Sequence, residues 1–83
     1  MRTLRLGEYE IEVVDFEDVT AAERVIEFRF SGDRKSSSFA AVVVPEGGGW
    51  SSAVLSIDPQ FGDVPAALMA VLMEVAREMI EAK

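Results

Sequence analysis

The amino-acid sequence predicts an α+β fold: a four- to five-stranded antiparallel β-meander with one C-terminal α-helix packed across one sheet face. Two patterns support this fold class. Short runs of alternating apolar and polar residues, separated by turn residues, occupy positions 4–57 and are typical of strands. Residues 64–83 instead repeat apolar side chains at steps of three and four, which is typical of a helix. A chain of 83 residues is the size of one domain, so residues 1–83 are predicted to form a single domain.

The N-terminal segment, residues 4–13, predicts a hairpin that turns at Gly7. Apolar residues occupy even positions before the glycine and odd positions after it, so the alternation changes phase there. A two-residue turn explains the change and places Arg5 opposite Glu10, a favourable pair of charges. One long strand with a glycine bulge is the alternative.

Residues 15–23 are predicted to form an acidic loop, because we find no strand period in them. Within this loop, residues 20–23 have the Thr-x-x-Glu form of a capping box, which could begin one helical turn.

Three further strands complete the predicted meander: residues 24–30, 37–44 and 50–57. The polar segment 31–36 and the glycine-rich segment 45–49 have the composition of turns between them.

The C-terminal helix is predicted to start near Asp63, a good N-cap residue, with Pro65 in its first turn. Leu72 and Val75 are expected to face the sheet at the centre of the core. The apolar arc of this helix spans roughly 200°, twice the minimum of about 100° for a helix with one buried face. The helix therefore has apolar surface beyond what one sheet contact needs.

Alternation also predicts which sheet face each side chain occupies, because a shift of one residue exchanges the two faces. Taking Phe39 as buried under the helix leaves Val42 and Val44 on the opposite face, together with Trp50 and Val54. Half of that second face is then apolar, whereas a free antiparallel face is usually polar. Alternatively, the N-terminal hairpin or the glycine-rich loop covers Trp50.

These considerations predict two alternative partner-binding surfaces, one on the sheet and one on the flank of the helix. The sheet surface comprises Val42, Val44, Trp50 and Val54, and the helix flank comprises Met69, Met73 and Ile80. A small domain without disulfides often gains stability by oligomerising. We therefore expect a homodimer of about 18 kDa, twice the chain mass of 9.1 kDa.

Catalytic and metal-binding residues are scarce in the sequence. The chain has no cysteine and no histidine, which removes thiolate catalysis, cysteine zinc sites and the usual neutral-pH general base. Gly47-Gly48-Gly49 precedes a predicted strand rather than a helix, so it does not resemble a phosphate-binding loop. We predict a protein that is not an enzyme and has no cofactor, no metal and no small-molecule substrate.

The charge of the chain further limits the classes of partner that it can bind. A net charge of -7 repels nucleic acid backbones and anionic membranes, and Arg34-Lys35 is too small a basic patch to change this. The N-terminus lacks the apolar core of a signal peptide. The apolar run 64–73 is about half the length needed to cross a bilayer. These features predict a cytoplasmic location.

The function predicted from the sequence is therefore a small acidic, non-enzymatic protein-binding module that acts as a homodimer or as a subunit of a complex. The alternative is an acidic inhibitor or nucleic-acid mimic that blocks a basic cleft of a partner. Its acidic surface would comprise Glu10, Glu12, Asp15, Glu17, Asp18 and Glu27. In the predicted register Glu12 lies across from Glu27.

Overall fold

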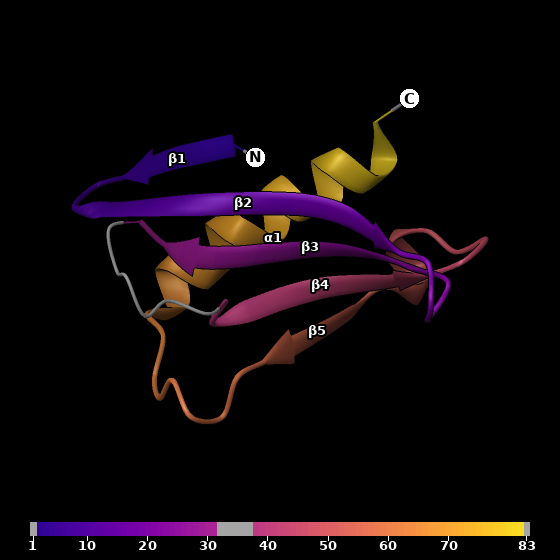
Figure 1. Cartoon of the computed structure of the whole chain (residues 1–83). Coiled ribbons are helices and arrows are strands. Elements are labelled where there is room, and N and C mark those ends of the chain that lie inside the picture. Colours follow the sequence, from indigo (N-terminus) through magenta and orange to yellow (C-terminus); the bar gives the residue numbers. More distant parts are fainter. Residues whose placement is uncertain (1, 32–37, 83) are drawn as a thin grey trace.

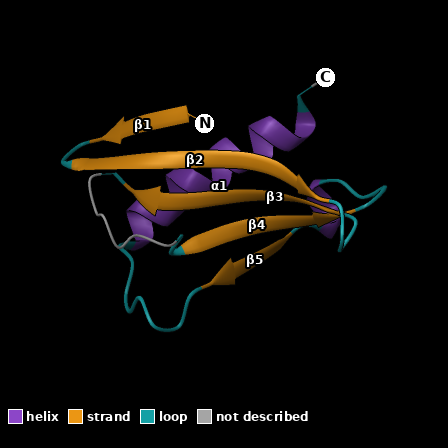
Figure 2. Ribbon diagram, in the orientation of Figure 1, coloured by secondary structure: helices purple, strands orange, loops and turns teal. Residues whose placement is uncertain are grey.

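The computed structural model describes residues 2–31 and 38–82 and contains one five-stranded antiparallel sheet with one helix behind it (Figures 1 and 2). The strands follow one another across the sheet in chain order, which confirms the predicted α+β meander. The elements are β1 (Arg2–Leu6), β2 (Tyr9–Asp18), β3 (Glu23–Phe30), β4 (Ala40–Pro45), the short 3-10 helix η1 (Trp50–Ser52), β5 (Val54–Ile57) and α1 (Ala66–Glu81). In this part of the chain no helix is long and apolar enough to cross a membrane.

The N-terminal hairpin forms as predicted. Gly7 adopts a positive φ of 64° in the turn between β1 and β2, a conformation that glycine reaches without steric cost. Arg5 pairs with Glu10 in the register, and their side chains lie 3.4 Å apart. The alternative of one bulged strand is therefore wrong.

The predicted acidic loop at residues 15–23 is wrong over most of its length. Strand β2 continues to Asp18, and β3 begins at Glu23. Residues 19–22 connect the two strands without forming helix, so the capping-box interpretation is also wrong. The Asp18 carboxylate instead accepts hydrogen bonds from the N–H and hydroxyl of Thr20 and from the N–H of Ala21.

The face assignment of β4 is wrong, and a bulge at its start explains why. Ala40 pairs with Phe28 in the register, yet the Phe39 N–H also donates to the Phe28 carbonyl, at 3.0 Å. Two residues thus oppose one, as in a β-bulge, and both Phe39 and Ala40 are buried. The extra residue reverses the alternation beyond it, so Val42 and Val44 lie in the core.

The predicted strand 50–57 is shorter than expected, because its first residues form η1. Trp50 lies there, partly buried against the core and not on the free sheet face. Trp50 leaves that face by packing against the core, rather than being covered on it by the N-terminal hairpin or the glycine-rich loop. The residues that directly follow Gly49 are therefore helical, and the strand begins only at Val54.

Helix α1 packs against the sheet through Leu68, Leu72 and Ala76, which are all buried. The central position predicted for Leu72 is confirmed, whereas Val75 is only half-buried. The predicted N-cap is wrong: Pro65 holds that position and no side chain caps the helix. Proline suits the start of a helix because the N–H it lacks would have no intrahelical acceptor there.

Four aromatic rings lie together within the core and at its margin. The Phe30 ring centroid lies 4.7 Å from that of Phe39, 5.6 Å from that of Phe61 and 5.9 Å from that of Tyr9. Stacked and tilted pairs at these distances add to the stability gained by burial.

The predicted turn at 31–36, including Arg34-Lys35, lies outside the described residues except for Ser31.

Candidate protein-binding surface

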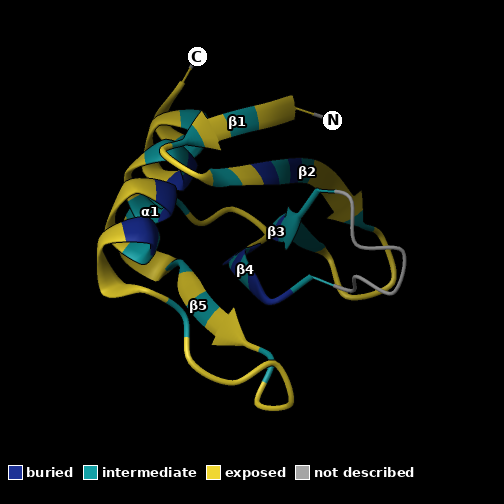
Figure 3. Cartoon of the chain, turned by 90° about the vertical axis from the view of Figure 1, so that its left-hand side faces the viewer, coloured by how far each residue is buried: buried dark blue, intermediate teal, exposed yellow. Residues whose placement is uncertain are grey.

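The face of the sheet opposite α1, called the outer face below, carries a continuous row of apolar side chains. Phe16 pairs with Val25, Val25 with Val43, and Val43 with Val54. These four residues, called the apolar row, cross the sheet from β2 to β5. Figures 1 and 3 show α1 on one side of the sheet only.

The apolar row is most exposed at its two ends. Phe16 is 40% exposed and Val54 is 62% exposed, while Val25 between them is buried by its neighbours. With strands about 4.8 Å apart, the row extends about 14 Å. The outer face therefore offers an aromatic ring and a valine, joined by apolar side chains, to an approaching protein.

The rows on either side of the apolar row mix charged and uncharged side chains. Asp18, Glu23 and Pro45 form the next cross-strand row toward the β2–β3 turn. The row on the other side is Val14, Glu27, Ala41 and Ser56. Asp18, Glu23 and Glu27 are the carboxylates beside the apolar row and are called the acidic rim below.

Of the sheet residues predicted to bind a partner, only Val54 lies on the outer face. Val42 and Val44 are 1% and 4% exposed and belong to the core, and Trp50 packs against that core from η1. On β4 the candidate surface therefore contains the odd-numbered Val43 and not the even-numbered Val42 and Val44.

The predicted helix flank does not form a separate exposed stripe. Met69, Met73 and Ile80 are partly buried and pack against the core. Val71 is the large apolar residue of α1 that stands most clearly in solvent, at 42% exposure.

Half of the residues in the predicted acidic surface are paired with arginines. Glu10 pairs with Arg5, and Glu12 with Arg29 at 3.1 Å. In the register Glu12 faces Arg29, so the predicted placement of Glu12 across from Glu27 is wrong.

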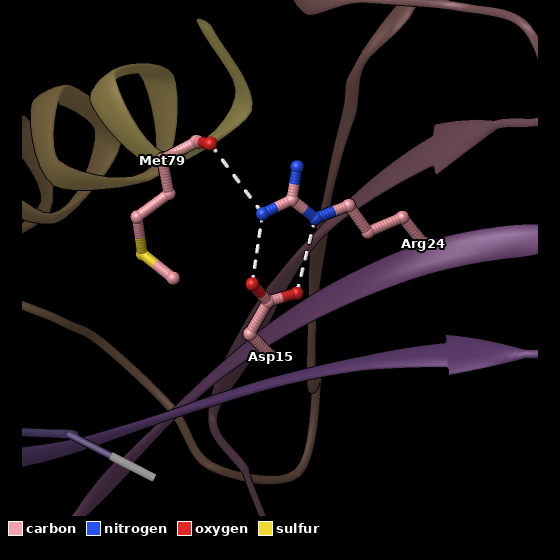
Figure 4. Close-up of polar contacts among 3 residues, drawn as sticks. All are labelled: Asp15, Arg24 and Met79. Carbon is pink, nitrogen blue, oxygen red and sulfur yellow. Dashed lines mark hydrogen bonds and ion pairs between the residues drawn. The ribbon is translucent and has the colours of Figure 1, made fainter. Parts of the chain in front are cut away.

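The third pair joins the sheet to the end of α1. Arg24 donates to both carboxylate oxygens of Asp15, at 3.0 and 2.8 Å, and also to the Met79 carbonyl, at 3.4 Å (Figure 4). The hydrogen bonds that Arg24 donates to the Asp15 carboxylate raise the pKa of the Arg24 guanidinium above its ordinary value. A positive charge at the last turn of a helix is favourable, because the carbonyl ends of the peptide dipoles point there.

The remaining carboxylates of the predicted acidic surface, Glu17, Asp18 and Glu27, are not in these pairs. Asp18 serves the β2–β3 turn, and its hydrogen bonds, above all from the Thr20 hydroxyl, hold its pKa below the ordinary value of 3.8. Glu17 and Asp18 also line an open cleft of about 500 Å³ beside Ile80. Among the described residues no cluster of acidic side chains has the arrangement needed to hold a metal ion.

Sequence reasoning missed the apolar row because it assigned Phe16 to a loop and Val43 to the core. One signal was present: Val14 and Phe16 alternate with Asp15 and Glu17, which is the period of a strand. The acidity of the segment obscured that period.

Comparison with known proteins identifies no matching family, no similar curated protein and no similar solved structure.

Proposed function

We propose that this chain is a non-enzymatic protein-binding module, acting as a homodimer or as a subunit of a complex, and that the outer face is its contact surface. The observation that carries the proposal is the apolar row. Such a face is usually polar when it stays in water. Contiguous apolar surface more often marks a site of interaction.

The order of side chains supports a protein partner. Protein interfaces combine an apolar centre with a polar rim, and aromatic residues such as Phe16 are enriched among their contacts. Strand residues are also held rigidly by their neighbours, so little conformational entropy is lost on binding. Charges such as those of the acidic rim affect the choice of partner and the rate of association more than the final affinity.

The alternative function, an acidic inhibitor or nucleic-acid mimic, has less support. Glu10, Glu12 and Asp15 have arginine partners within the chain, which reduces the charge they offer to a basic cleft. Binding of that kind would weaken strongly as salt rises, whereas an apolar contact would persist.

The experiment compares two valine-to-lysine substitutions on opposite sides of the molecule. Val54→Lys places a charge in the apolar row, and Val71→Lys places the same charge on the exposed side of α1. Light scattering at micromolar concentration should give about 18 kDa, twice 9.1 kDa, for the wild type and for Val71→Lys. Val54→Lys should be monomeric. If all three proteins are monomers, the partner is a different protein, and the same two variants are then compared in its co-purification. Equal behaviour of Val54→Lys and Val71→Lys in both assays would contradict the choice of surface.

A further inference from the structure

Strand β2 is longer than β1, and within residues 2–31 and 38–82 no strand pairs with the last part of β2 on its β1 side. Arg2 of β1 pairs with Val13, and the β1–β2 register runs from there back to the turn. The rest of β2, residues 14–18, pairs with β3 on one side only. Figure 1 shows β2 continuing past the N-terminal end of β1. We call Val14–Asp18 the free edge, since no strand in the described part of the chain lies along its other side.

The backbone groups on the free edge belong to Asp15 and Glu17. The Ser31 N–H donates to the Glu10 carbonyl, at 2.9 Å, so even-numbered residues of β2 direct their backbone groups toward β3. In a strand, successive residues point these groups in opposite directions. Asp15 and Glu17 thus present two N–H donors and two carbonyl acceptors at an open edge, which is a template for another strand.

The side chains around this edge define what an added strand should carry. Asp15 and Glu17 lie on the helix side of the sheet, and Phe16 lies on the outer face. Arg24 neutralises one carboxylate of this group through its pair with Asp15, which leaves the helix side net negative. A strand paired here would place alternate side chains beside carboxylates on one face and beside Phe16 on the other.

A second copy of this chain is a poor occupant of the free edge. Antiparallel pairing about a two-fold axis at Phe16 would set Asp15 of each copy against Glu17 of the other. Although Arg24 offsets the Asp15 charge, each copy still brings a net negative group to the pair, and like charges on adjacent strands are destabilising. The charge pattern of the edge favours a different strand, with basic residues at these positions.

We infer that the free edge of β2 receives an extended segment of a partner protein in which lysine or arginine alternates with apolar residues. The segment extends the sheet by strand addition: backbone hydrogen bonds hold it, and alternate side chains select it. This inference rests on the proposed protein-binding function and specifies the chemistry of the partner. The apolar side chains of the segment would lengthen the apolar row next to Phe16.

The test uses synthetic nine-residue peptides of alternating lysine and valine, with a glutamate-valine peptide as the charge control. Amide hydrogen exchange by NMR reads the edge directly. In the free protein, the N–H groups of Asp15 and Glu17 should exchange much faster than those of Val14 and Phe16, which face β3. The lysine peptide should slow exchange at Asp15 and Glu17 by roughly tenfold or more, and the glutamate peptide should not.

Two variants locate the binding on the edge. Glu17→Lys reverses an edge charge, and Glu17→Pro removes an N–H that β2 does not use toward β3. Each should weaken lysine-peptide affinity by roughly tenfold or more. Glu74→Lys, on the exposed side of α1, is the matched charge control and should bind normally. If Glu17→Pro fails to fold, Glu17→Lys with its control still decides.

Three outcomes would overturn the inference. The first is equal protection of Asp15, Phe16 and Glu17 in the free monomer, which would mean that the edge is already covered. The second is protection of Asp15 and Glu17 that rises with protein concentration alone, which would assign the edge to a second copy. The third is peptide binding that survives both Glu17 variants and is lost in Val54→Lys. That result would place the partner on the outer face, so the proposed function would stand without the edge.

Discussion

Arg24 binds Asp15 from a diagonal position on the neighbouring strand, although the residue directly opposite Arg24 is Glu17. The guanidinium thereby reaches the Met79 carbonyl as well. One side chain of β3 thus joins an acidic residue of β2 to the last turn of α1.

We expect Arg24→Met to lower the free energy of unfolding by about 1 kcal/mol, the upper range for a partly exposed ion pair, because its geometry is bidentate. Urea titration measures the loss, which should shrink as salt screens the pair. Arg77→Met is the control, since its pair with Glu81 lies on the surface of the helix and should contribute about 0.3–0.5 kcal/mol. Equal losses would argue against a special role for Arg24.

Leu72→Ala should cost roughly 2–5 kcal/mol of stability, because it leaves a cavity where the buried helix face meets the sheet. Val75→Ala, one turn further along the helix and only half-buried, should cost about 1 kcal/mol or less. Denaturant titrations of both variants give the comparison. A larger loss for Val75→Ala would mean that the helix is rotated from the orientation described.

Trp50 should report its contact with the core. Because the indole is partly buried, its fluorescence emission should be blue-shifted in the folded protein and should move to longer wavelength on unfolding in urea. Acrylamide should quench the folded protein less than the unfolded one. Identical quenching in both states would place the indole in solvent.

The β2–β3 turn should respond to acid through Asp18. The pKa of this carboxyl is lower in the folded state, so the unfolded chain binds more protons as pH falls toward and below 3.8. Its contribution to stability is therefore complete above about pH 5 and disappears as pH falls through the folded-state pKa. A carbon NMR titration should find the lowered pKa. Thr20→Ala should raise that pKa toward its ordinary value, while Thr3→Ala should leave it unchanged.

Several parts of the fold follow from local pattern. The change of phase at Gly7 was enough to predict the hairpin and the pairing of Arg5 with Glu10. The spacing of apolar residues was enough to predict the C-terminal helix and the burial of Leu72. Both features depend on residues close together in the chain, where helix and turn geometry limit the choices.

The faces of β4 depend on contacts that local pattern does not contain. Phe39 is buried because its ring packs against Phe30 and Phe61, 4.7 and 5.3 Å away between centroids. That packing accommodates a bulge, and the bulge decides which valines of β4 are buried. The candidate surface inherits this dependence, since Val43 reaches the outer face only because Phe39 and Ala40 both point inward.

Because of the bulge, the number of residues between Phe39 and Val42 matters to the fold as much as their identity. Removing one residue between Phe39 and Val42 would exchange the two faces of the strand on one side of the deletion. Either Phe39 would leave the aromatic cluster, or Val42 and Val44 would turn to solvent. A conservative substitution at the same positions changes one side chain, whereas a deletion of one residue reassigns a whole strand. The junction between Phe39 and Ala40 is therefore a place where this fold should tolerate replacement of residues far better than any change in their number.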